Sequence, residues 1–215
     1  MLDPVSTAPD VPVRPPRRRR KAARAGEIVT AALAHFAEHG YAHTRLEDVA
    51  RRAGIAKSTV YLYFENKEAL FRATVAAHVS STFEDMGALV ESWTGDVASL
   101  LEAVIRHAYA GLVQPDNLAL LRIIIAEGER FPELRDAFYD AEMCHGRRIV
   151  EGLVARGVAC GEFADGPAAE FPRLVVAPVI TAAVWRLTFE ALEPIDAERW
   201  IDAHLALLMD GLRAR

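Results

Sequence analysis

The sequence predicts an all-α protein with a small N-terminal three-helix head, which contains a helix-turn-helix, and a larger C-terminal helical bundle. Apolar residues recur at the three- and four-residue spacing of helices along most of the 215-residue chain. No stretch alternates apolar and polar residues with period two, so no sheet is expected. A hydrophobic content of 52% suffices for a sizeable core and excludes general disorder.

The first helix of the head is predicted from about Lys21 to His39, and Gly40 is expected to end it as a C′ glycine. Ahead of it, residues 1–20 contain five of the eleven prolines and almost no apolar residue that could be buried. This composition predicts a disordered arm, which closes with a basic run. The buried stripe of the helix is expected to consist of Ile28, Val29, Ala32, Leu33 and Phe36.

Residues 44–64 indicate two short helices joined by a tight turn. Thr44 and Glu47 have the spacing of a capping box at the start of the first of these helices. Gly54 allows the sharp reversal between them. In the second helix Val60 and Phe64, four residues apart, are expected to point inward, which leaves hydroxyl and phenol side chains on the surface.

A surface helix rich in Ser, Thr and Tyr and flanked by lysines has the donors to bind phosphates and read base edges. The segment therefore predicts a helix-turn-helix that reads double-stranded DNA. The basic run before it favours contacts with the minor groove or phosphates, with a solvated charge run or a nuclear-localisation signal as alternatives. The expected DNA-binding residues are Arg17, Arg18, Arg19, Arg20, Thr44, Arg45, Lys57, Ser58, Thr59, Tyr61, Leu62, Tyr63 and Lys67.

Residues 22–72 resemble the TetR family of bacterial transcriptional regulators. The resemblance extends from Phe36-Ala37-Glu38-His39-Gly40-Tyr41 through the two helices into Glu65-Asn66-Lys67-Glu68-Ala69-Leu70. It implies a small DNA-binding head and a larger helical body that binds a ligand and dimerises. The sequence departs from the family at Ala56, where a Ser or Thr cap is usual, and at Leu62, where a His is common. A TetR subgroup is similar at Arg122-Ile123-Ile124-Ile125-Ala126-Glu127 and Arg130-Phe131-Pro132-Glu133-Leu134.

The rest of the chain is expected to form helices throughout. Asn66 is a suitable N-cap for a helix that runs beyond Val79. Apolar stripes predict further helices over 97–112 and 118–130, a long helix from near Pro132, an apolar helix over 174–192, and a last helix capped by Asp196. The domains expected are a basic arm (1–20), a DNA-binding domain (21–66), and a ligand-binding and dimerisation domain (67–215).

The body is expected to bind a small hydrophobic or amphipathic effector between its helices. Candidate ligand residues are His107, Phe138, His145, Trp185 and Arg186, each of which could instead belong to the core. The last two helices are expected to pair with those of a second copy as a homodimer, although packing within one chain would use the same side chains. Candidate interface residues are Val184, Ile201, Leu205, Leu208 and Leu212.

The net charge of −5 conceals an asymmetry. Residues 14–72 contain 13 Lys or Arg against 6 acidic residues, whereas the rest of the chain contains 12 basic and 24 acidic ones. A basic head on an acidic body is typical of a protein that binds a polyanion in one orientation. Neither a signal peptide nor a membrane span is evident, so the protein is expected in the cytoplasm.

No enzyme, cofactor or metal site is expected. His35 and His39 have the spacing of a helical metal pair but lack a third ligand nearby, and Cys144 and Cys160 favour reduced thiols over a redox pair. Two alternatives stay open: a catalytic body using Glu127, Glu129 and His145, and a nucleoid-type architectural protein. The sequence favours a repressor that binds a palindromic operator as a dimer and is released by its effector.

Overall fold

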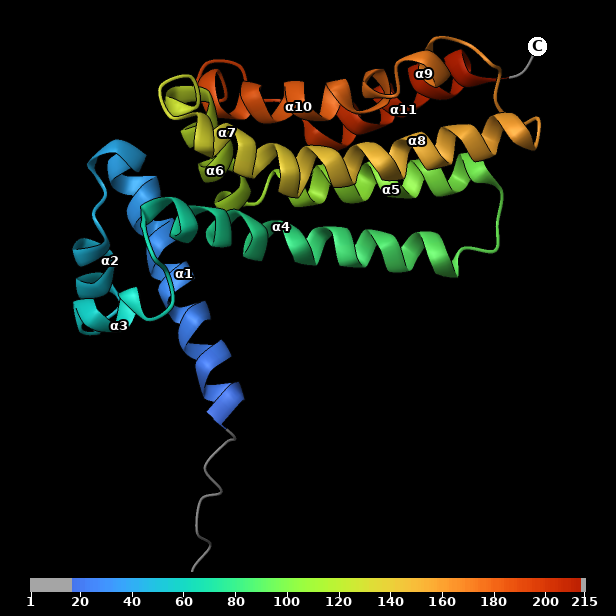
Figure 1. The fold of residues 1–215 in the computed structure, drawn as a ribbon. Coiled ribbons are helices and arrows are strands. Elements are labelled where there is room, and N and C mark those ends of the chain that lie inside the picture. Colours follow the sequence, from blue (N-terminus) through green and yellow to red (C-terminus); the bar gives the residue numbers. More distant parts are fainter. Residues whose placement is uncertain (1–16, 214–215) are drawn as a thin grey trace, which may run out of the picture.

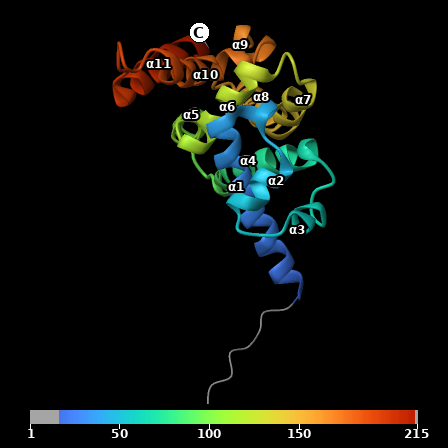
Figure 2. The same cartoon turned by 90° about the vertical axis from the view of Figure 1, so that its left-hand side faces the viewer.

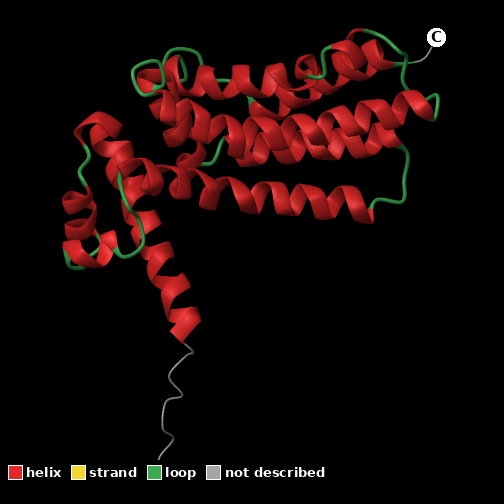
Figure 3. Ribbon diagram, in the orientation of Figure 1, coloured by secondary structure: helices red, strands yellow, loops and turns green. Residues whose placement is uncertain are grey.

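The structure is a computed structural model that describes residues 17–213, without the side chains of residues 17–20, 22, 79–82 and 142. This part of the chain contains helices and one isolated antiparallel bridge between Phe163 and Arg213, but no strand, which confirms the all-α prediction (Figure 3). The elements are α1 (Arg17–His43), α2 (Leu46–Arg52), α3 (Lys57–Tyr61), α4 (Lys67–Ser92), α5 (Val97–Leu112), α6 (Pro115–Glu127), α7 (Pro132–Phe138), the π-helical turn η1 (Tyr139–Met143), α8 (Cys144–Ala159), α9 (Pro167–Glu170), α10 (Arg173–Thr188) and α11 (Ala197–Leu212).

The helices form a head, α1–α3, at one end of a layered bundle (Figure 1). α4 leaves the head and continues along the bundle, so a single helix belongs to both parts. In Figure 1, α5 and α8 lie between α4 on one side and α10 and α11 on the other. None of the described helices is long and apolar enough to cross a membrane.

Helix α1 begins four residues earlier than expected. The backbone of Arg17–Arg20 forms its first turn, whereas the sequence predicts a disordered arm for these residues. Arg and Lys are good helix formers, so the basic run can extend the helix once the apolar stripe downstream has fixed it. That stripe is buried as predicted, and Gly40 interrupts the helix with φ 76° and ψ 168°. The rest of the predicted arm, residues 1–16, lies outside the described residues.

The predicted capping box at the start of α2 is wrong. Arg45 is the N-cap residue and makes no side-chain cap, while the Thr44 hydroxyl donates to the Gly40 carbonyl at 2.7 Å. The two expected Asx caps are confirmed, because Asn66 accepts from the Ala69 amide at 2.8 Å and Asp196 from the Arg199 amide at 3.3 Å.

The long helix predicted from Pro132 is interrupted by the π turn η1. A π turn inserts one extra residue and rotates everything that follows about the helix axis. The sequence predicts Phe138 and His145 on one buried row, and Phe138 is buried, but beyond the turn His145 is exposed. Val150 is buried instead, and Gly146 lines an internal cavity.

Gly157 of α8 packs closely against Phe163, in the segment that follows the helix. A Cβ at Gly157 would lie 2.1 Å from Cδ2 of the buried Phe163 ring. Gly157→Ala should therefore lower the free energy of unfolding by about 1–3 kcal/mol through overpacking. Denaturant unfolding at a fixed protein concentration measures this change.

Gly152 in the same helix supplies the control, because a Cβ there would meet no atom within 4 Å. Gly152→Ala should raise the free energy of unfolding by about 0.5–1 kcal/mol, the usual gain from replacing Gly in a helix. Equal effects of the two substitutions would contradict the contact with Phe163.

Candidate nucleic-acid interface and internal cavity

The head forms a compact helix-turn-helix. Gly54, at φ 67°, reverses the chain after α2, and the Ile55 amide donates to the Ala50 carbonyl at 3.0 Å across the turn. Val60 and Phe64 are buried, as predicted. Figure 2 shows α3 in the part of the head that lies far from α10 and α11.

Most of the predicted DNA-binding residues lie at the surface of the head. Tyr61 is 46% exposed and Leu62 77% exposed. Five of the others divide by exposure: Arg45, Lys57 and Ser58 are exposed, and Thr59 and Tyr63 are half-buried. The side chains of Arg17, Arg18, Arg19 and Arg20 lie outside the described ones.

Lys57 ties the start of α3 to α2. Its ammonium forms an ion pair with Glu47 and lies 5.7 Å from the centre of the Tyr61 ring. The hydrogen bond to Glu47 raises the pKa of Lys57 and lowers that of Glu47, so both stay charged at neutral pH. A second pair, Arg52 with Glu38, makes two hydrogen bonds of 2.6 Å between α2 and α1.

Two predicted DNA contacts are directed into the protein instead. Thr44 is 2% exposed and its hydroxyl is used by Gly40, so this side chain is not available to a duplex. The Lys67 ammonium donates to the Tyr41 carbonyl at 2.7 Å and lies 4.2 Å from the centre of the Tyr41 ring. Burial lowers the pKa of Lys67, although Glu127 and Glu133 oppose the shift.

These contacts belong to a junction between head and body that sequence reasoning missed. The Glu127 carboxylate, at the end of α6, accepts the Tyr41 amide at 2.6 Å and the Ala42 amide at 2.8 Å. The Tyr41 hydroxyl donates to Glu133 at 3.3 Å. A side chain at Gly40 would collide with this carboxylate, since its Cβ would lie 2.6 Å from Glu127 Oε1.

Aromatic rings surround the same junction. The Tyr41 ring lies 5.1 Å from Phe131, 5.5 Å from Phe71 and 5.7 Å from Phe36, measured between ring centres. Glu127 and Phe131 lie in the two segments that resemble a TetR subgroup. This resemblance was the feature of the sequence that could have pointed to the junction. The catalytic cluster considered for Glu127 is not supported, because its carboxylate is used by the backbone of the head while Glu129 and His145 are exposed.

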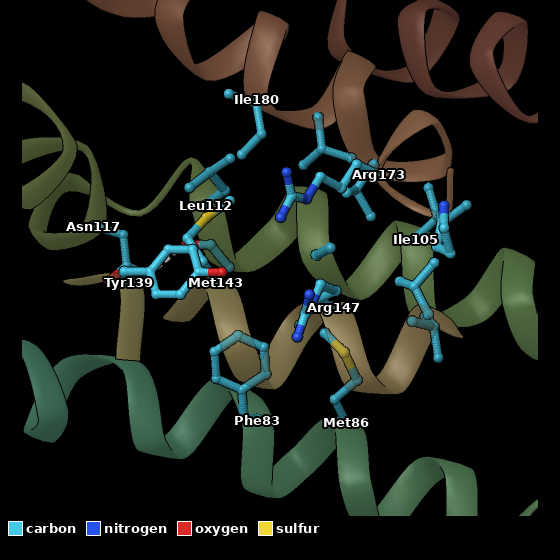
Figure 4. A pocket seen from close by; sticks show the side chains of 18 residues that line it. Phe83, Met86, Ile105, Leu112, Asn117, Tyr139, Met143, Arg147, Arg173 and Ile180 are labelled. Atoms are coloured by element: carbon cyan, nitrogen blue, oxygen red, sulfur yellow. Dashed lines mark hydrogen bonds between the residues drawn. The ribbon is translucent and has the colours of Figure 1, made fainter. Parts of the chain in front are cut away.

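The body contains a partly open cavity of about 130 Å³ between α4, α5, α6, η1, α8 and α10 (Figure 4). Its described lining is apolar apart from Asn117, Tyr139, Arg147 and Arg173. The other lining residues are Phe83, Met86, Val104, Ile105, Ala108, Gly111, Leu112, Met143, Gly146, Val150, Pro172, Val176, Val179 and Ile180.

None of the five predicted ligand residues lines this cavity. His107 is half-buried and Phe138 is part of the core, while the π turn leaves His145 exposed. The Trp185 indole donates to the Glu193 carbonyl at 2.7 Å. Arg186 borders a separate cavity of about 370 Å³ between α5, α10 and α11, together with Arg106, Tyr109, Ala110, Val113, Ala182, Ile195, Ala197, Glu198, Trp200 and Ile201.

The predicted dimer interface is only partly accessible. Leu205 and Leu212 are 5% and 3% exposed, because they pack into the core of their own chain. Val184, Ile201 and Leu208 are half-buried. The apolar surface of α10 and α11 is instead formed by Leu174, which is 56% exposed, and Leu207, which is 78% exposed; both border a hollow of about 360 Å³.

The remaining candidate pairs do not form sites in the described part of the chain. The rings of His35 and His39 stack with 4.2 Å between their centres, and burial lowers the pKa of His35. Cys144 and Cys160 are free thiols at opposite ends of α8, about 24 Å apart at 1.5 Å per residue. A disulfide requires Cα atoms within about 7 Å, so the redox pair is wrong for this fold.

A helix-turn-helix head joined by one long helix to a bundle with an internal cavity defines a ligand-responsive transcriptional regulator. This chain belongs to the TetR family. The family model described as bacterial regulatory proteins, tetR family, matches residues 28–74, and that of the tetracyclin repressor-like C-terminal domain matches residues 92–204.

Curated relatives and solved structures agree with this assignment. The chain is 26% identical over 195 residues to the fatty acid metabolism regulator protein of Bacillus subtilis, covering 86% of this chain and 94% of that protein. The structure of FadR from Bacillus subtilis in complex with stearoyl-CoA matches with a TM-score of 0.68 at 24% identity, covering 87% and 99% of the two chains. A transcriptional regulator from Saccharomonospora viridis in complex with choline matches with a TM-score of 0.73 at 19% identity, covering 91% and 100%.

Replacing Glu127 tests the junction. Glu127→Gln keeps the shape of the side chain but turns an amide NH₂ toward one of two backbone donors, which is then left without an acceptor. The free energy of unfolding should fall by about 1–3 kcal/mol, the usual cost of an unsatisfied buried donor.

The matched control is Glu129→Gln, two residues further along and exposed. It should change the free energy of unfolding by no more than about 0.5 kcal/mol, as surface substitutions usually do. Similar effects of both variants in denaturant unfolding would show that the carboxylate of Glu127 does not hold the head.

Proposed function

We propose that this regulator is a repressor that binds a palindromic operator as a homodimer and is released when a small amphipathic effector enters the cavity bounded by α4 and α6. The observation that carries the proposal is that these two helices reach both the cavity and the head. α4 begins with Lys67 at the junction and carries Phe83 and Met86 in the cavity lining. α6 contributes Asn117 to the lining and ends at Glu127.

This connection supports a mechanism of release. A ligand that prefers a bundle in which α4 or α6 is displaced would carry Lys67 or Glu127 with it, and with them the backbone at Tyr41. In a dimer, such a movement changes the separation of the two heads. The ligand needs a few kcal/mol of differential affinity for the two states to shift the population appreciably. The protein would then act in the cytoplasm through binding alone, without catalysis.

The surface of α3 supports operator reading. Ser58 and Thr59 stand near the start of α3, where base edges are reached in helix-turn-helix complexes, and Tyr61 and Tyr63 follow with phenols suited to phosphates. The half-sites of a dimer should be about 34–36 Å apart or a multiple of this distance.

Mapping the genomic binding sites and comparing the affinity for the operator with that for a scrambled duplex tests the proposal. Equal affinity for both would favour a nucleoid-type architectural protein instead.

Salt dependence separates Arg45 from Lys67. For a dimer touching about 6–10 phosphates, log K against log salt should have a slope between about −5 and −9. Arg45 is exposed and makes no cap, so Arg45→Gln should flatten this slope by about one unit for each phosphate that the side chain neutralises.

Lys67→Met keeps most of the side-chain volume and is the contrasting variant. Because the Lys67 ammonium binds the Tyr41 carbonyl, this change should leave the slope unaltered and lower the free energy of unfolding by about 1–3 kcal/mol. A flatter slope with unchanged stability would show that Lys67 reaches a phosphate in the complex.

The dimer is proposed to form through the exposed apolar surface of α10 and α11, which includes Leu174 and Leu207. Leu207→Glu would bury a charge between two copies at a cost of several kcal/mol. Sedimentation at micromolar concentration should then show a folded monomer with reduced operator affinity.

Leu205→Glu is the comparison, since Leu205 is buried within its own chain and its replacement should unfold the body rather than separate two folded copies. A Leu207→Glu protein that stays dimeric would place the interface elsewhere.

A further inference from the structure

The charged residues in the described lining of the cavity bounded by α4 and α6 are all positive. Its 18 described lining residues include two arginines, Arg147 of α8 and Arg173 of α10, and among these described residues there is no Asp, Glu, Lys or His. Figure 4 shows both guanidinium groups reaching into the same hollow from different helices, with Phe83 and Met86 on the α4 side.

Both arginines are exposed, and few of the described carboxylates lie near them. Among the described side chains, Glu151 is the carboxylate within ion-pair distance of Arg147, at 3.6 Å from Nε, which is too long for a hydrogen bond. Within the described part of the chain, no carboxylate lies within ion-pair distance of Arg173. Arg173 is also the first residue of the 16-residue helix α10, whose N-terminal dipole adds to the positive potential at this end of the cavity.

The size of the cavity limits the apolar part of a ligand. About 130 Å³ is less than the roughly 300 Å³ or more of cavities that hold drug-sized ligands. A slender chain therefore fits more easily than a fused ring system. Met86 and Met143 are unbranched side chains that can move aside as such a chain enters.

We propose that the effector of this cavity is an amphipathic anion, with a carboxylate or phosphate head bound by Arg147 and Arg173 and an unbranched hydrocarbon chain among the apolar side chains. The inference rests on the proposed function of the cavity as the effector site. It differs from the sequence-based expectation, in which Arg186 was the arginine among the candidate ligand residues. Arg186 borders the other cavity. There, Arg106 already forms ion pairs with Glu102 and Asp202, and Glu198 also lines the cavity.

Calorimetric titration of the full chain with matched ten-carbon probes below their micelle concentrations tests the sign of the charge. Decanoate should bind about tenfold or more tightly than decan-1-ol, since the alcohol lacks the charge-assisted hydrogen bonds, and decyltrimethylammonium should bind more weakly still. Among carboxylates, affinity should rise by about fourfold per methylene group until the cavity is filled.

Arginine variants locate the contact. Arg147→Gln and Arg173→Gln should each weaken decanoate binding by about tenfold and leave decan-1-ol binding unchanged. The matched control is Arg148→Gln, which is adjacent in sequence and exposed like Arg147 but lies outside the lining, and which should bind decanoate as the wild type does. Arg186→Gln should also have no effect.

Two further probes identify the source of the charge. Decanoyl-coenzyme A binding more tightly than decanoate, with coenzyme A alone not binding, would indicate a phosphate-bearing acyl thioester, and the reverse order a free carboxylic acid. Decan-1-ol or decyltrimethylammonium binding as tightly as decanoate would overturn the proposed anion while leaving the cavity as the effector site. If the protein still binds its operator but binds none of the probes, both the anionic effector and the effector role of the cavity are wrong. If the protein binds no operator, the proposed function alone is wrong.

Discussion

The Glu127 carboxylate fixes the relation between the two parts of this molecule. Two consecutive backbone amides, those of Tyr41 and Ala42, point at its two oxygens, and Lys67 occupies the carbonyl of the same residue, Tyr41. A charged acceptor shared by two amides is stronger and more directional than a pair of neutral contacts. The positive φ of Gly40 is part of the same arrangement, because it interrupts α1 near its end and leaves the space that the carboxylate fills. The orientation of the reading helix therefore depends on a residue that is far from it in sequence.

The cavity and this junction are connected by rigid elements. α4 is a 26-residue helix and α6 a 13-residue helix, and each spans from the cavity lining to the junction. Packed helices transmit a displacement along their length with little deformation, since protein interiors resist compression. For the effector proposed above, the apolar lining would supply binding energy and the two arginines would supply discrimination.

Local patterns in the sequence were sufficient for the fold class and the head, but not for the sites around them. Val60 and Phe64 could be assigned to the core because their four-residue spacing and the glycine turn before them are local features. The sequence could not show that Lys67 binds a backbone carbonyl and not a phosphate, because that carbonyl belongs to a residue 26 positions away along the chain. The cavity was the hardest part to predict, since its described lining comes from α4, α5, α6, η1, α8 and α10, which are far apart in the sequence. The one extra residue of the π turn η1 has no sequence signature, yet it brings Arg147 into the lining and leaves His145 outside.

The junction also determines how this regulator could be recombined with others. Consider a hybrid in which residues up to 66 are taken from another regulator and the rest from this protein. In that hybrid, Lys67, Glu127 and Glu133 of this body would meet a foreign loop where residues 40–42 now lie. A donor with a side chain at the position of Gly40 would place a Cβ against the Glu127 carboxylate, and a donor without a tyrosine at the position of Tyr41 would lose the contacts of its ring with Lys67 and of its hydroxyl with Glu133. Compatible chimaeras are therefore those whose parents match at these few positions, whatever their similarity elsewhere.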